Sequence, residues 1–212
     1  MKKNSMLSVF ALLVSLTFAF GGNSDTLVLK SKPVYGKEAR VISFILDNNH
    51  YRRMHLNDSL SSAILDHYLN ELDNNKTYFL ASDIKSFDKF RFSLDDLTRN
   101  ENVEPAYEIY NIFRIRYKER MDYLMNNLIG KEFDYTVDEY YETDREKEPW
   151  ASSTNELNEI WRKIIKSQAL SLKLAGKQPS EIKETLDKRY QRFIKSVAQF
   201  TSEDVFNVYM NS

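Results

Sequence analysis

The 212-residue sequence contains no cysteine, which excludes a disulfide framework and any thiolate chemistry. A chain of this size does not need disulfides, because it can bury a sufficient hydrophobic core. Glycine and proline are also scarce, at five and four residues, so little interrupts the helical spacing of apolar residues that recurs in nearly every segment. These features together predict an all-α fold.

A surplus of positive charge is missing as well. The sequence has 30 basic and 31 acidic residues, for a formal net charge of −1. Without Lys2 and Lys3, which belong to the N-terminal segment described below, 28 basic residues face 31 acidic ones. Nucleic-acid-binding proteins usually show a basic surplus. The balance therefore argues against a nucleic-acid partner.

Histidine is rare, and His50, His55 and His67 are the only three. They form neither an H-E-x-x-H motif nor an i, i+4 pair, so the ligand spacing of a zinc site is absent. Solvated or locally hydrogen-bonded histidines are the favoured interpretation. We therefore expect no metal and no cofactor.

The first 21 residues are typical of a secretory signal peptide. Lys2 and Lys3 form a basic start, an almost uncharged apolar run covers Met6–Phe20, and small residues follow near Gly21. The run is short for a membrane span, although an uncleaved N-terminal anchor is the alternative. With no cysteine near the cleavage region, lipid attachment there is excluded. The sequence thus predicts export to the periplasm, with membrane contact only through an uncleaved signal.

The rest of the chain is predicted to form an extended arm over residues 22–37 and one helical, bundle-like domain over residues 38–212. The longest helix is expected to begin at Pro105 and to end at Gly130. Its apolar residues recur at intervals of three or four and should face the core; they are Ala106, Tyr110, Phe113, Tyr117, Met121, Leu124 and Leu128. Other helices are expected over Glu38–Arg53, after the cap in LNDS (56–59), after Ser82 or Asp83, over Ser153–Gly176, from Pro179, and from Thr201.

Residues 131–152 break this pattern and are predicted to form a long irregular excursion. The segment is rich in charge, and we expect Tyr140, Tyr141 and Trp150 to hold it in place by burying their rings. The aromatic residues of 133–150 have a second interpretation, which is an exposed patch for another domain. A strand hairpin is less favoured, because no two-residue turn signal follows.

The chain closes on TSEDVFNVYMNS (201–212), a helix start without a stop signal. Thr201 and Asp204 fit a capping box, and Val205, Phe206 and Tyr209 follow as apolar residues. If this helix continues into another domain, part of its apolar side should lack cover. Its amides should then exchange hydrogen faster than those of residues 106–128.

Two S-x-x-K tetrads raise the question of serine–lysine catalysis, at Ser82–Lys85 and Ser180–Lys183. A lysine one turn after a serine can act as its base when it is desolvated. Both tetrads, however, stand at expected helix starts, where serine and acidic residues cap backbone N–H groups. Helix capping is the favoured interpretation, so no catalytic residue is assigned.

A basic stripe lies on the helix expected after Pro179. Lys188, Arg192 and Lys195 share one face, with Arg189 alongside. A solvated surface, supported by an i, i+4 pair between Glu184 and Lys188, is the favoured interpretation. A docking surface for an acidic partner is the functional alternative. These four basic residues are the candidate partner-facing site.

Several longer stretches resemble the N-terminal helical domain of the tail-specific proteases, also called carboxy-terminal processing proteases. The resemblance runs in order through about Ala39 to Asn211. It rests on LDHYLNELDNNKTYFLASDI (65–84), DREKEPW (144–150), NELNEIW (155–161), LSLKLAGKQPSEIKETLDKRY (170–190) and AQFTSEDVF (198–206).

The resemblance implies a part of an exported serine peptidase of the bacterial cell envelope. Such enzymes use a serine–lysine dyad, and their PDZ domain recognises the apolar C-termini of envelope proteins, including enzymes that cut peptidoglycan. Some members use a helical-repeat lipoprotein as an adaptor. The family's PDZ and catalytic portions follow the helix that begins at Thr201, and neither S-x-x-K tetrad matches its dyad.

The leading hypothesis is therefore a non-catalytic helical domain. It would pack against its own PDZ and protease domains, help to shape substrate entry, and offer a docking place for an adaptor. A free-standing exported helical binding module is the alternative, and it predicts a stop codon soon after Ser212.

Overall fold

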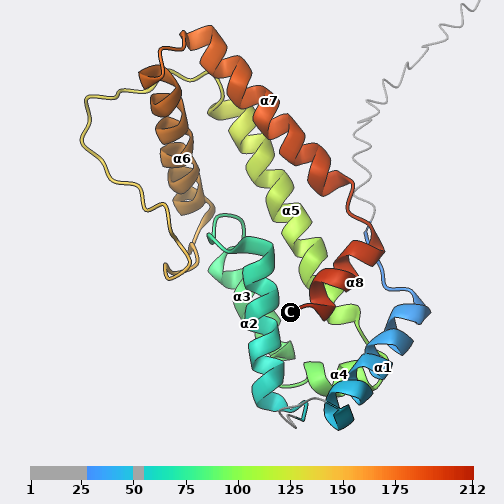
Figure 1. Ribbon diagram of the computed structural model, residues 1–212. Helices are drawn as coiled ribbons and strands as arrows, with labels where there is room; N and C mark the ends of the chain where they lie inside the picture. The colour runs from blue at the N-terminus through green and yellow to red at the C-terminus, as the bar shows by residue number, and fades with distance from the viewer. Residues whose placement is uncertain (1–27, 50–54) are drawn as a thin grey trace, which may run out of the picture.

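In the computed structural model, residues 28–49 and 55–212 are described, and every regular element among them is helical. The all-α prediction is thus confirmed for this part of the chain. The predicted signal peptide, His50 and the last four residues of the helix predicted over Glu38–Arg53 lie outside the described residues. The helices form an elongated molecule with α5 along its middle (Figure 1).

One end of the molecule is built from helices that are shorter than those of the other end. These are α1 (Pro33–Asn49), α2 (Asp58–Asp73), α3 (Ala81–Phe87), the 3-10 helix η1 (Asp88–Phe90) and α4 (Leu94–Arg99). Helix α4 packs against both α1 and α2. At α1, Gly36 permits a close approach, because a Cβ there would lie 2.1 Å from the carbonyl oxygen of Glu101.

Three long helices form the other end, namely α5 (Glu104–Asn127), α6 (Thr154–Leu174) and α7 (Pro179–Ala198). Pro105 stands in the first turn of α5, and Gly130 follows the helix with a φ of +80°, as the C-terminal stop signal predicts. Gly176 does the same after α6, with a φ of +85°. The chain then returns along α5 to α8 (Ser202–Met210), which packs on α5 and α2.

The apolar stripe predicted for the longest helix forms the centre of the core. All seven of its residues are buried, from Ala106 to Leu128. Aromatic residues from other elements pack around it; Tyr78 lies edge-on to Phe113 at 5.6 Å between ring centroids, and Phe79 lies 5.8 Å from the same ring. The helical spacing of apolar residues alone therefore identified the face of α5 that is buried in the core.

Several boundaries differ from the sequence prediction. Helix α1 begins at Pro33, inside the predicted extended arm, because proline is well suited to the first turn. Helix α3 begins after Leu80, whose N–H donates to the Asp83 carboxylate at 2.9 Å, so Asp83 caps from within the helix. Helix α4 was not predicted at all.

The excursion over 131–152 is irregular, as predicted, and of its three predicted anchors Tyr141 and Trp150 are partly buried. Tyr140 is 84% exposed, so the prediction that its ring is buried is wrong. Trp150 is half-buried against the core and lies 6.0 Å from Phe79. Glu139 instead ties the middle of the excursion to α6 by accepting hydrogen bonds from Arg162 and Lys166.

Candidate interaction site

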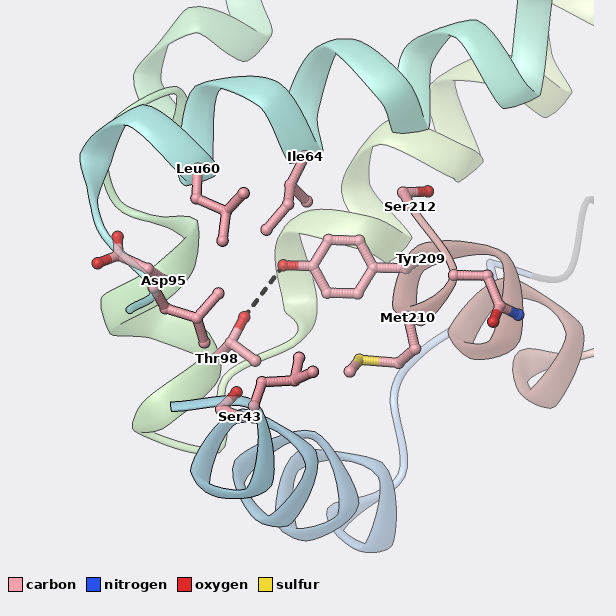
Figure 2. Close-up of a pocket in the computed structure, with 11 residues that line it drawn as sticks. Ser43, Leu60, Ile64, Asp95, Thr98, Tyr209, Met210 and Ser212 are labelled. Carbon is pink, nitrogen blue, oxygen red and sulfur yellow. Dashed lines mark hydrogen bonds between the residues drawn. The ribbon is translucent and has the colours of Figure 1, made fainter. Parts of the chain in front are cut away.

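The end of the molecule formed by α1, α2, α4 and α8 contains a pocket of about 250 Å³ (Figure 2). Its walls are mostly apolar, and all four helices contribute side chains to them, including Leu46, Leu60, Ile64 and Met210. Concave surfaces with mostly apolar walls and a few polar groups are typical of binding pockets. The pocket is therefore an apolar recess in the surface.

A polar network closes the base of this pocket. Asp95 is buried and accepts hydrogen bonds from the Ser61 hydroxyl at 2.8 Å and from Arg99 at 3.1 Å. Arg99 also donates to Asp47 and to the carbonyl of Leu56. Because each buried polar group here has a partner, the network fixes how α1, α2 and α4 meet. It is a structural network rather than a reactive one.

Helix α8 supplies the remaining wall through Tyr209. The Tyr209 ring is buried, and its hydroxyl lies 3.1 Å from the hydroxyl of Thr98 (Figure 2). Burial raises the pKa of Tyr209 above its ordinary value, so the phenol stays neutral. Val205 and Phe206 are also buried, and Phe206 stacks on Tyr35 at 4.8 Å. Most of the apolar side of this helix is therefore covered by α1, α2, α4 and α5, whereas Val208 and Met210 are only partly buried and Met210 borders the pocket.

The outer face of α1 extends the apolar surface away from the pocket. Its inner residues Tyr35, Ala39 and Ser43 are buried. Four side chains on the outer side are nevertheless apolar as well, with exposed fractions between 46% and 68%; we call Val34, Val41, Phe44 and Ile45 the α1 outer face. The same helix also exposes Lys37, Glu38 and Arg40. A helix that is apolar on two sides usually packs on both. No described residue covers this second side.

The two S-x-x-K tetrads lie on the surface. Ser82, Lys85, Ser180 and Lys183 are all exposed. A lysine can serve as a general base only when burial lowers its affinity for a proton, and these lysines are in solvent. The structure thus gives neither tetrad the environment that serine–lysine catalysis requires.

Both described histidines are exposed surface residues. His55 lies 3.9 Å from Asp47, and His67 lies 4.0 Å from Glu71. Among the residues that the structure describes, no three side chains of the metal-binding types gather closely enough to hold an ion. In the same residues, no helix is both long enough and apolar enough to span a membrane.

The structure divides the predicted basic stripe on α7. Lys188, Arg192 and Lys195 are exposed, and Lys188 pairs with Glu184 at 2.5 Å, as the i, i+4 spacing predicts. Arg189 points toward α6 instead and donates to the Gln168 side chain at 3.0 Å. Arg189 therefore contributes to helix packing, and the outward basic surface consists of the other three residues.

Sequence reasoning missed the residues that α4 contributes to the pocket, Asp95 and Thr98. The helix is six residues long, too short for apolar periodicity to mark it. A local signal does exist, since Ser93 followed three residues later by Asp96 has the spacing of a capping box. That signal would have placed a helix start, though not its contacts.

Comparison with known proteins points to one family. Residues 42–212 match the family model described as the tail specific protease N-terminal domain. The chain is also 34% identical over 168 residues to the tail-specific protease of Haemophilus influenzae. That alignment covers 79% of this chain and 24% of the relative, so the chain spans about a quarter of the relative's length.

Proposed function

Because the chain belongs to the tail-specific protease family, as its N-terminal domain, we propose that it is a non-catalytic domain that docks on its own protease body through the α1 outer face and the adjacent pocket. The observation that carries this proposal is the second apolar side of α1, where Phe44 is 68% exposed. The relative is about four times as long as the matched region, which leaves ample protein to cover it.

The physical basis is the area of apolar surface that association would bury. Scattered apolar residues on a surface are normal, but four on one helix that adjoins an apolar pocket form a patch typical of an interface. Burial of such side chains contributes about 25 cal/mol for each Å² removed from water. Arg99, which pairs with Asp95, also donates to Asp47 of α1 at 3.3 Å, so α1 is held in place and the patch is already formed before docking.

The finer parts of this function rest on family resemblance and on the N-terminal sequence. We propose that the parent enzyme is exported to the periplasm by the predicted signal peptide. There it would use a serine–lysine dyad outside this domain to cut envelope proteins that its PDZ domain recognises at apolar C-termini. The domain would support this body, border substrate entry and receive an adaptor lipoprotein in those members that use one.

The test compares one substitution in two contexts. Phe44→Glu should leave the melting temperature of the 212-residue chain nearly unchanged, because the side chain is exposed there. In the full-length protease the same change should lower the melting temperature and the protection of α1 from proteolysis. Phe92→Glu is the matched control, since Phe92 is 62% exposed at a different site.

Two results would contradict the proposal. One is an equal, small effect of Phe44→Glu and Phe92→Glu in the full-length protein. The other is cleavage of a peptide with an apolar C-terminus by the 212-residue chain alone. A coding sequence that stops soon after Ser212 would favour the free-standing binding module instead.

A further inference from the structure

The turn between α6 and α7 lies at the end of the molecule opposite α1 (Figure 1). A second concave surface is found beside this turn. The cleft has a volume of about 640 Å³, which is within the range of ligand-binding pockets. Three segments meet there, namely the residues after α5, the C-terminal end of α6 and the first turns of α7. We call it the lysine cleft.

Its floor is apolar and its rim is basic. Leu128 and Leu186 are buried at the floor, and Phe133 and Ile182 are partly buried beside them. The rim carries four lysines and a single carboxylate; these residues are Lys131, Lys173, Lys177, Lys183 and Glu132. This combination of an apolar base and a ring of one charge sign is unlike the mixed charges elsewhere on the helices.

The four ammonium groups form no close ion pair among the described residues, although Lys177 lies near enough to Glu184 to help lower the pKa of that carboxyl. In the described part of the chain, none of them has a carboxylate within 4.0 Å, whereas the neighbouring Lys188 pairs with Glu184. Glu181, the acidic residue in the first turn of α7, uses its carboxylate to accept the Gln178 N–H at 2.8 Å. With four lysines and one glutamate, the rim therefore presents a surplus of positive charge to solvent.

Two contacts hold the walls of the cleft in place. The Lys173 ammonium lies 4.7 Å from the centre of the Tyr135 ring, a cation–π contact that joins α6 to the excursion. The Lys183 stem packs over Gly130, where a Cβ would lie 2.9 Å from its Cδ. The cleft is thus shaped by packing between three segments.

We propose that the lysine cleft binds an acidic peptide segment that carries at least one apolar or aromatic side chain. Carboxylates would pair with the rim, and the apolar side chain would cover the floor residues Leu128 and Ile182. A concave site with an apolar base fits a protruding peptide side chain better than a flat anionic membrane. This inference concerns a different surface from the α1 outer face and does not depend on docking there.

The test uses the 212-residue chain and a fluorescent eight-residue peptide with alternating glutamate and leucine. Lys177→Gln/Lys183→Gln should raise the dissociation constant about tenfold, since each exposed charge pair contributes modestly and two are removed. Lys30→Gln/Lys85→Gln is the matched control, because it removes the same charge from exposed lysines elsewhere. Binding should weaken with added salt.

A second peptide, with serine in place of leucine, should bind more weakly than the first if the floor contributes. An equal loss of peptide binding in the cleft variant and the control variant would overturn the proposal, because it would show that the peptide is attracted to the chain's positive charge in general. The proposal is also overturned if no peptide binding is detected, or if the chain binds anionic phosphatidylglycerol vesicles but neither peptide.

Discussion

At the scale of single residues, Asp73 organises the segment between α2 and α3. Its buried carboxylate accepts hydrogen bonds from the backbone N–H groups of Thr77, Tyr78 and Phe79, at 2.8, 2.9 and 2.9 Å. Burial raises the pKa of Asp73 above its ordinary value, while the three donors oppose that rise. One side chain thus satisfies three backbone donors in a turn that places two core aromatics.

Replacing this carboxylate by an amide should therefore destabilise the domain. Asp73→Asn keeps one acceptor oxygen but sets an NH₂ group against a backbone N–H, so we expect the free energy of unfolding to fall by about 2 kcal/mol. Urea denaturation measures the change. Asp122→Asn, at an exposed residue of α5 paired with Lys118, should cost far less. Equal effects of the two substitutions would contradict this role.

Glu139 gives the domain a pH-dependent contact. Hydrogen bonds from Arg162 and Lys166 lower the pKa of Glu139 from 4.5 to about 2. Because the folded-state pKa is depressed, the contact stabilises the excursion above pH 4.5 and is lost as the pH falls through about 2.

NMR titration of the Glu139 carboxyl carbon should give a midpoint near 2. Arg162→Gln should move that midpoint up toward the ordinary value, because it removes one of the two cations that donate to the Glu139 carboxylate. A midpoint near 4.5 in the unaltered chain would show that the contact does not form in solution.

At the scale of elements, α8 shows how a local signal and its tertiary use differ. The Thr201–Asp204 capping box is present, with the Asp204 carboxylate accepting the Thr201 N–H at 2.8 Å. The helix is nonetheless held mainly by tertiary contacts, including the hydrogen bond from the Tyr107 hydroxyl to the Ser202 carbonyl at 2.7 Å. The lack of a sequence stop signal after α8 therefore did not predict how well this helix is packed.

The burial of α8 changes the exchange behaviour that we expect. Amides of residues 206–209 should exchange more slowly than those of the irregular residues 137–143, because buried helical hydrogen bonds open only with larger unfolding events. Thr201→Ala should reduce the free energy of unfolding by about 1 kcal/mol through loss of the cap. Rapid exchange throughout α8 would show that its contacts with α5 do not persist.

At the scale of the whole molecule, the α1 outer face and the lysine cleft lie at opposite ends, separated by the length of α5 (Figure 1). A domain with an apolar surface at one end and a basic cleft at the other could hold the protease body and a peptide at once. The surfaces share no residues, so neither should block the other.

Their effects should therefore be independent. Phe44→Glu should leave binding of the acidic peptide unchanged, and Lys177→Gln/Lys183→Gln should leave the stability of the full-length protease unchanged. In the combined variant the two effects should add, as is usual for distant sites without shared partners. Coupling by more than about 0.5 kcal/mol would show that the ends communicate through α5.

The sequence by itself determined the helical fold, the core stripe of α5, the glycine stops after α5 and α6, and the family. These features depend on local spacing and on backbone conformations that neighbouring residues dictate. The sequence also identified the residues of the basic stripe, although it did not show that the Arg189 side chain points toward α6.

Only the tertiary structure showed which side of an apolar helix packs in the core and which side stays exposed. The apolar run of α1 reads the same on both sides in sequence, yet only packing against α4 shows that Ala39 is inside and Phe44 outside. The lysine cleft likewise gathers Lys131, Lys173 and Lys183 from three segments. Contacts between distant segments depend on how helices meet in space, which periodicity within one helix does not specify.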